Sequence, residues 1–216
     1  VETLDPGKIK FPFINDYGNE KPFDQIIVKA SSEVKSLKDL EGKKVGVFPG
    51  STSTVLMKKV LQDSGVDISN IEFVQIATQS QLQALESGSI QALHSYEPVT
   101  TIAIESGVAK KLYGSVFAQI VDPNPLGVSM MSTKFISDRP EAAKKLVRTY
   151  LRALEYIRDN EQDVRTTIIP KYLKLESKYA QKVTLIPMSA PTASNKEKMQ
   201  KLADVLNEYI ETDIVQ

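Results

Sequence analysis

Polar residues that could bind a ligand gather in a turn between a predicted strand and a predicted helix. An apolar run ends at Phe48, and apolar residues at helical spacing begin after Thr54. In an open parallel sheet, ligands bind beyond the carboxyl ends of the strands, where a helix start offers unpaired N–H groups and partial positive charge. The turn therefore predicts a site for a polar or anionic group, formed by Gly50, Ser51, Thr52 and Ser53. The alternative is that Ser51 or Thr52 only caps the helix.

Two more segments pass from a predicted strand into a predicted helix, so both should reach the same edge of the sheet. Tyr96 and Glu97 follow one strand and offer an aromatic face, a phenol and a carboxylate. Gln79 follows another strand. We expect these three side chains to contact the ligand. The alternatives are that Glu97 only favours the helix dipole and that Ser80 is the residue that caps its helix.

Several kinds of chemistry lack the residues they need. The chain has no cysteine and a single histidine, His94, so a transition-metal site would need a carboxylate cluster, and none stands at suggestive spacing. Neither the Gly-Lys-Ser/Thr triplet of a phosphate-binding loop nor a Gly-x-Ser-x-Gly elbow occurs. We therefore expect no metal, no cofactor and no catalytic residue, and a structural hydrogen-bonding role for His94.

The charges argue against a nucleic-acid partner. Lysine and arginine together number 27, and so do aspartate and glutamate, with no long run of either sign. A protein that neutralises phosphates normally needs a basic face. In addition, no stretch approaches the ~20 apolar residues of a membrane span.

Strands and helices alternate over the middle of the chain, which predicts a parallel, doubly wound α/β sheet. The predicted strands of this series are Lys44–Phe48, Ile71–Ile76, Ile90–His94 and Lys110–Tyr113, and a separate predicted strand, Gln25–Lys29, precedes it. The predicted helices between them are Thr54–Ser64, Ser80–Ser87 and Pro98–Ser106. After a strand-like run, Leu126–Ser132, the chain is almost wholly helical. Its apolar stripes, with their aromatic and methionine positions, are expected to be core.

Four stretches of the chain resemble the substrate-binding proteins of ABC importers, in the branch that binds aliphatic sulfonates, taurine, nitrate or thiamine precursors (NMT1/THI5-like). These stretches are Ser36–Val47 (SLKDLEGKKVGV), Pro49–Thr52, Gln81–Leu93 and Tyr96–Pro98. The likeness runs from about Phe23 to the C-terminus. It implies a type II periplasmic-binding-protein fold, in which two α/β lobes joined by two crossing strands close on a ligand.

The resemblance also implies a division of the chain. Residues 24–125 would form the complete second lobe, and residues 1–23 with 126–216 the first lobe, with Asn124 contributing to the ligand site at the hinge. Members of this family usually carry several strand–helix units before the point at which Val1 begins. The first lobe is therefore expected to be incomplete, which predicts self-association or an unstable terminal third.

The implied function is that of an extracytoplasmic solute-binding component of an ABC importer, not an enzyme. It would trap a small polar or anionic organic solute in the cleft between its lobes and deliver it to the importer permease. The protein would be peripheral to the membrane, periplasmic or on the outer face, and secreted or lipid-anchored. Two alternatives share the fold: the ligand-sensing domain of a transcription regulator, and a pyrimidine-synthesising enzyme of thiamine biosynthesis. The enzyme's family pattern is cysteine-rich, which this chain is not.

Overall fold

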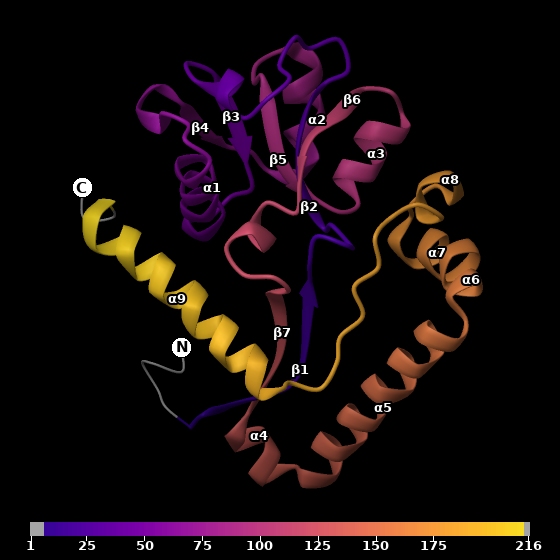
Figure 1. Ribbon diagram of the computed structural model, residues 1–216. Coiled ribbons are helices and arrows are strands. Elements are labelled where there is room, and N and C mark those ends of the chain that lie inside the picture. Colours follow the sequence, from indigo (N-terminus) through magenta and orange to yellow (C-terminus); the bar gives the residue numbers. More distant parts are fainter. Residues whose placement is uncertain (1–6, 214–216) are drawn as a thin grey trace. The chain divides into compact units, whose positions relative to one another are not determined.

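The computed structural model describes the backbone of residues 7–213, and their side chains except those of Ser51, Leu126 and residues 209–213 (Figure 1). The chain folds into two compact units. Unit 1 comprises Val1–Asp16, Pro125–Gln181 and Leu185–Lys198. Unit 2 comprises Tyr17–Asn124, Lys182–Thr184 and Met199–Gln216.

Residues 24–114 of unit 2 form a five-stranded sheet and three helices. Its elements in chain order are β2 (Asp24–Lys29), β3 (Lys44–Val47), α1 (Ser51–Asp63), β4 (Glu72–Gln75), α2 (Thr78–Ser87), β5 (Ala92–Tyr96), α3 (Val99–Glu105) and β6 (Ala109–Gly114). Short 3-10 turns lie at Lys38–Leu40, Ile68–Asn70 and Phe117–Gln119. Each predicted strand and helix of this region is present within a few residues of its expected bounds.

The sheet of unit 2 is mixed, with the strand order β4-β3-β5-β2-β6. Strand β3 pairs in parallel with β4 and β5, whereas β2 pairs antiparallel with both β5 and β6. The four strands of the alternating series, β3, β4, β5 and β6, therefore run in one direction as predicted, and β2 runs against them. That strand enters from outside the alternating strand–helix series and has no crossover helix to impose a parallel direction.

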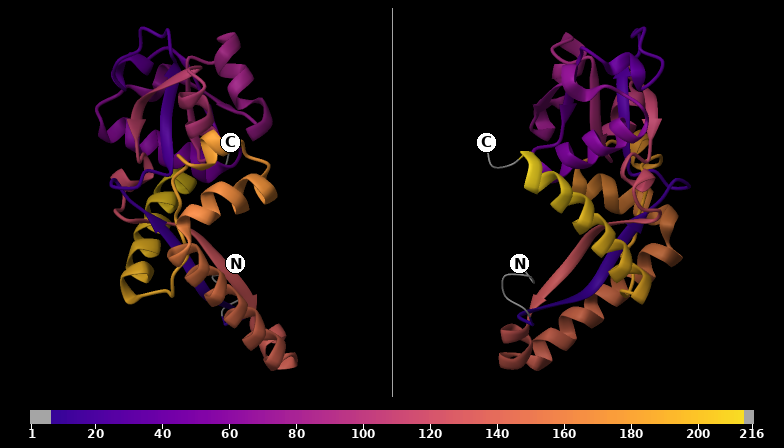
Figure 2. Two further views of the ribbon diagram at one scale, coloured as in Figure 1. Left: turned by 90° about the vertical axis from the view of Figure 1, so that its right-hand side faces the viewer. Right: turned by 60° about the vertical axis from the view of Figure 1, so that its left-hand side comes forward.

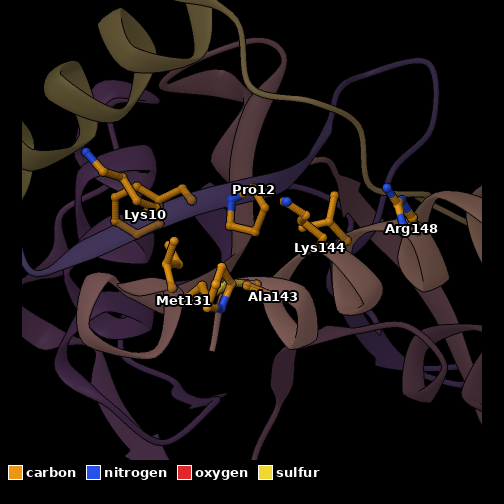
Figure 3. Close-up of a pocket in the computed structure, with 10 residues that line it drawn as sticks. Lys10, Pro12, Met131, Ala143, Lys144 and Arg148 are labelled. Atoms are coloured by element: carbon orange, nitrogen blue, oxygen red, sulfur yellow. The ribbon is translucent and has the colours of Figure 1, made fainter. Parts of the chain in front are cut away.

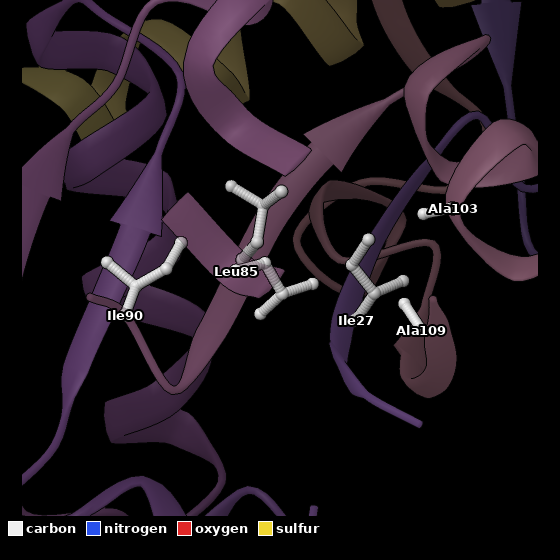
Figure 4. Close-up of a cluster of buried hydrophobic side chains, with 6 residues drawn as sticks. Ile27, Leu85, Ile90, Ala103 and Ala109 are labelled. Carbon is white, nitrogen blue, oxygen red and sulfur yellow. The ribbon is translucent and has the colours of Figure 1, made fainter. Parts of the chain in front are cut away.

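The core of unit 2 lies where α2 and α3 contact each other and the strands β2 and β5. A cluster of fully or nearly buried apolar side chains fills this space (Figure 4): Ile27, Leu85, Ile90, Leu93, Ala103 and Ala109. Gly46 of β3 lies beside it. A Cβ at Gly46 would stand 2.6 Å from Ile90 Cδ1, so a larger residue here would force the Ile90 side chain to shift.

Unit 1 holds the pairing of two long strands, which run side by side in all the views (Figures 1 and 2). These strands are β1 (Ile9–Tyr17) and β7 (Asn124–Ser132). The helices are α4 (Thr133–Asp138), α5 (Pro140–Asp159), α6 (Glu161–Asp163), α7 (Ile169–Leu173), α8 (Ser177–Ala180) and α9 (Ala193–Asp213), whose last turns belong to unit 2. A π-helical turn, Val164–Ile168, separates α6 from α7.

The apolar stripe of α5 differs from its prediction as core. Ala143 is its buried residue, while Leu146, Tyr150 and Leu151 are 42%, 42% and 45% exposed. Tyr156, Tyr172 and Met199 on the late helices are also exposed. The helical period was correct, but the described part of unit 1 supplies too little sheet to cover the stripe.

Candidate functional site

Helix α1 begins directly after a glycine in an unusual backbone conformation. Gly50 is the N-cap residue, with φ at 122°, a conformation that other residues rarely adopt. Its N–H donates to Gln75 Oε1 at 3.2 Å, which ties the turn to the end of β4. Neither Ser51 nor Thr52 is the N-cap residue, so the interpretation of one of them as the cap was wrong. The Thr52 residue is exposed, and the side chain of Ser51 lies outside the described part.

Ser53 is placed differently from its neighbours in the same turn. It is 5% exposed, and its Oγ is buried without a hydrogen bond of ordinary geometry among the described residues. It lies beside the phenol of Tyr96, at the end of β5. Burial raises the pKa of Tyr96 to about 12, an effect that the Ser53 hydroxyl opposes and the Asp24 carboxylate reinforces. The phenol is therefore protonated at neutral pH and can donate a hydrogen bond.

An aromatic cluster surrounds Tyr96. Ring centroids lie 5.5 Å away for Phe48, 5.3 Å for His94 and 6.0 Å for Phe23. Phe48 follows β3 directly and remains 39% exposed. Since β3 and β5 are parallel neighbours, the cluster lies at their carboxyl ends, where the sequence predicted a site.

Glu97 lies at the start of α3. Burial raises the pKa of its carboxyl group, while Thr101 and Thr100 and the backbone of Thr184 oppose the rise by hydrogen bonding to it. Its Oε2 is buried without a hydrogen-bond partner of ordinary geometry in the described part. The carboxylate therefore makes hydrogen bonds to the first residues of α3. This supports the alternative that Glu97 stabilises the helix dipole. Its contact with a ligand stays a prediction.

The histidine of this cluster belongs to a buried acid–imidazole pair that sequence reasoning missed. Asp24 Oδ2 is 2.8 Å from His94 Nε2, and neither side chain is exposed. The same oxygen accepts from the backbone N–H of Phe117 at 3.3 Å. Burial, reinforced by Asp24, raises the pKa of Tyr17. The buried position of His94 and its hydrogen bond to Asp24 confirm the structural role that was expected for it.

The comparisons with known proteins agree with this fold. The family model described as NMT1/THI5 like matches residues 18–164, which is more than half of the chain. The chain belongs to the NMT1/THI5-like family. A Bacillus subtilis protein named as a candidate aliphatic sulfonates-binding protein is 23% identical over 190 residues, which are 88% of this chain and 51% of that protein. The chain thus spans about half the length of the curated relatives it matches.

Solved structures show the fold of this NMT1/THI5-like chain. The periplasmic aliphatic sulphonate binding protein SsuA from Escherichia coli superposes with a TM-score of 0.75 at 16% identity, over 99% of this chain and 68% of that one. The desulfurization enzyme DSZB superposes with a TM-score of 0.70 at 15% identity, over 94% and 73% respectively. The architecture is that of the SsuA-type periplasmic binding proteins, and it serves binding proteins and enzymes alike.

Gln79 is exposed on the first turn of α2. That helix begins at Thr78 with Ala77 as its N-cap, so Ser80 does not cap it as the alternative supposed. The glutamine with an internal role is Gln81, which is fully buried. It donates to the carbonyl of Ile76 at 3.1 Å and accepts from the Ser95 hydroxyl at 2.6 Å.

The side chain of Asn124 also makes a hydrogen bond inside the protein. It is 2% exposed, and its Nδ2 donates to the carbonyl of Phe117 at 3.1 Å. Contact between Asn124 and a ligand stays a prediction. Of the residues predicted from sequence, the structure brings Ser53 and Tyr96 together.

The chemistry available at this edge of unit 2 is that of binding. A protonated phenol, a buried hydroxyl and a helix start all donate hydrogen bonds, and Phe48 offers an apolar surface. Among the described residues, no group of three His, Asp or Glu side chains is arranged to hold a metal ion.

Proposed function

We propose that this chain is the solute-binding component of an ABC importer and that unit 2 supplies part of the binding site for a small polar or anionic organic solute. One observation carries the proposal: the buried Ser53 hydroxyl lies beside the protonated Tyr96 phenol, and the Tyr96 ring contacts the partly exposed ring of Phe48. Membership of the NMT1/THI5-like family and the names of its relatives support it.

The donors favour a particular kind of solute. An acceptor-rich group such as a sulfonate can take hydrogen bonds from Tyr96, Ser53 and the first N–H groups of α1. An apolar tail attached to that group would rest on Phe48. An alkanesulfonate combines both features, and it is also what the named relatives are said to bind.

Calorimetry with ethanesulfonate, nitrate and an aminopyrimidine tests the proposal. We expect ethanesulfonate to bind with one site per chain. The Tyr96→Phe variant should bind it about 5- to 10-fold more weakly, because one hydrogen bond is worth roughly 1 kcal/mol. No heat with any of the three solutes, or equal affinity in Tyr96→Phe, would contradict the proposal.

Turnover is tested separately. After prolonged incubation with the pure protein, mass spectrometry should recover the solute unchanged. Conversion of ethanesulfonate or of an aryl sulfinate would instead align this chain with the desulfurization enzyme, whose fold it shares.

The location and partner follow from the same function. A solute-binding component works outside the cytoplasmic membrane and delivers its solute to a permease. Within residues 7–213, no helix is both long and apolar enough to cross a membrane. Addition of the protein with its solute should stimulate the ATPase activity of the reconstituted cognate importer, and a lack of stimulation would remove this part of the proposal.

A further inference from the structure

An apolar pocket of about 490 Å³ lies in unit 1, against β1, α4 and α5 (Figure 3). Pro12, Met131 and Ala143 line it together with the cations Lys144 and Arg148. Nothing in the described part of the chain shows what would cover this surface, so no proposal rests on it. The contacts that carry one lie where the chain passes from one unit to the other.

The chain enters unit 2 for three residues between α8 and α9. Gln181 belongs to unit 1, Lys182–Thr184 belong to unit 2, and Leu185 belongs to unit 1 again. We call Lys182–Thr184 the strap. It has neither helical nor strand structure, so regular backbone pairing does not hold it in unit 2. Its position must depend on individual contacts.

Contacts with both ends of α3 hold the strap. The ammonium group of Lys182 pairs with the carboxylate of Glu105, the last residue of α3. The backbone N–H of Thr184 donates to the carboxylate of Glu97, two residues before α3 begins. Val183, between these two anchors, is 6% exposed. The strap therefore lies along α3 in the opposite chain direction.

The residues before the strap are held separately, within unit 1. Arg165 Nη1 donates to the carbonyl groups of Ala180 and Gln181, each at 3.3 Å. The backbone is thus fixed on both sides of the bond from Gln181 to Lys182, by an arginine of unit 1 before it and by carboxylates of unit 2 after it. Release of the strap would therefore be a local event of a few residues.

The two anchors of the strap differ in strength. The side chains of Lys182 and Glu105 are 57% and 33% exposed, so water and salt screen their attraction. Glu97 has a buried Oε2, and its carboxylate accepts the Thr184 N–H where little water competes. A hydrogen bond to a charged acceptor is stronger in such surroundings. The strap therefore depends mainly on Glu97.

Glu97 also connects the strap to the candidate solute site, because it directly follows Tyr96 in the chain. A solute that covers Tyr96 removes water from around the neighbouring carboxylate. Hydrogen bonds to a charged group become stronger as the local dielectric constant falls. The bond between Glu97 and Thr184 should then tighten.

We propose that the strap is a latch on unit 2, which Glu97 fastens and solute binding tightens. The fastening depends on residues of this chain alone, whereas the tightening by solute rests on the proposed function. Coupling between two sites is reciprocal, so a variant that loosens the strap must also weaken solute binding.

Amide hydrogen exchange of the Thr184 N–H, followed by NMR in the free protein, tests the fastening. Glu97→Gln replaces a charged acceptor with a neutral one, and we expect it to speed this exchange about fivefold or more. The amides of β5 should keep their rates, which separates release of the strap from unfolding of unit 2. The control is Glu176→Gln, which removes an exposed pair with Lys178 in α8. Unchanged exchange at Thr184 in Glu97→Gln, or equal acceleration by both variants, would overturn the proposal.

Ethanesulfonate tests the coupling. At saturation it should slow the exchange of the Thr184 N–H several-fold in the wild type. Lys182→Met loosens the strap and leaves Glu97 intact, and it should weaken ethanesulfonate binding about two- to threefold in calorimetry. Binding without slower exchange at Thr184, or equal affinity in Lys182→Met, would overturn the coupling. Absence of binding to the wild type would instead contradict the proposed function, and exchange in the free protein would still decide whether the strap is a latch.

Discussion

The carboxylate of Asp24 and the imidazole of His94 meet inside unit 2, with 2.8 Å between Oδ2 and Nε2 and no exposure of either side chain. They stand on neighbouring strands, β2 and β5, where the antiparallel register places Ile26 opposite His94. Asp24 also accepts from Phe117 N–H, so one carboxylate connects three segments of the chain.

Replacement of this carboxylate should therefore destabilise unit 2. Asp24→Asn leaves the shape but removes the charge from both hydrogen bonds, and we expect the free energy of unfolding in urea to fall by about 1–3 kcal/mol. The matched control is Asp63→Asn, which removes an exposed pair with Lys59 and should cost less than ~1 kcal/mol. Equal losses of unfolding free energy in the two variants would show that the buried pair stabilises the fold no more than the exposed pair does.

Gly46→Ala should also destabilise unit 2, for a steric reason. The added methyl group would stand 2.6 Å from Ile90 Cδ1 and 3.1 Å from Leu93 Cδ1, and we expect a cost of about 1–3 kcal/mol in thermal or urea unfolding. Gly114→Ala is the control, because its Cβ would meet only Lys111 Cδ at 3.7 Å. If Gly46→Ala left the stability unchanged, β3 would be able to move away from its neighbours.

Ser53→Ala should separate stability from binding. The hydroxyl is buried without a regular partner, so its removal should leave the free energy of unfolding unchanged or slightly higher. The same variant should bind ethanesulfonate several-fold more weakly in calorimetry, by roughly 1 kcal/mol for one hydrogen bond. Thr52→Ala, an exposed neighbour in the same turn, is the comparison. A loss of stability without a loss of affinity would make Ser53 structural.

Glu97 should give unit 2 a measurable dependence on pH. Burial raises its pKa above the ordinary 4.5, so the folded state holds this proton more tightly than the unfolded state does. Its contribution to stability is then fully present below pH 4.5 and is lost as the pH rises through the raised pKa. In urea unfolding at a series of pH values, the stability of the wild type relative to Glu97→Gln should decline across that window and then level off. A difference that grows with pH would contradict this sign.

Sequence patterns predicted the elements of unit 2 well because each strand is a short apolar run bounded by turn residues. The direction of β2 was not predicted. The period of β2 is the same whichever way it pairs, and its partners β5 and β6 lie far along the chain. For the same reason the Asp24–His94 pair was missed, since 70 residues separate its members and only the register brings them together.

Site residues were predictable where they lie at a strand end or a helix start. They were not predictable where two nearby side chains of the same kind could each be the buried one. Tyr96 and Ser53 lie at strand ends and helix starts, as the rule for open sheets requires. Gln79 and Gln81 differ by two residues on one helix, and small shifts in where α2 begins decide which of them is buried. In α5, the pattern identified the apolar face but could not say how much of the chain would cover it.

The sheet of unit 2 begins and ends at the same place, because its first and last strands are paired neighbours. Gln25, just inside the incoming strand, is the register partner of Gly114, at the end of the outgoing one, and the N–H of Ser115 donates to the carbonyl of Asp24 at 2.9 Å. Residues 24–114 thus form a loop-like insert whose ends are already joined by backbone hydrogen bonds. Such a module can be exchanged as a cassette between relatives, with only two neighbouring junctions to match.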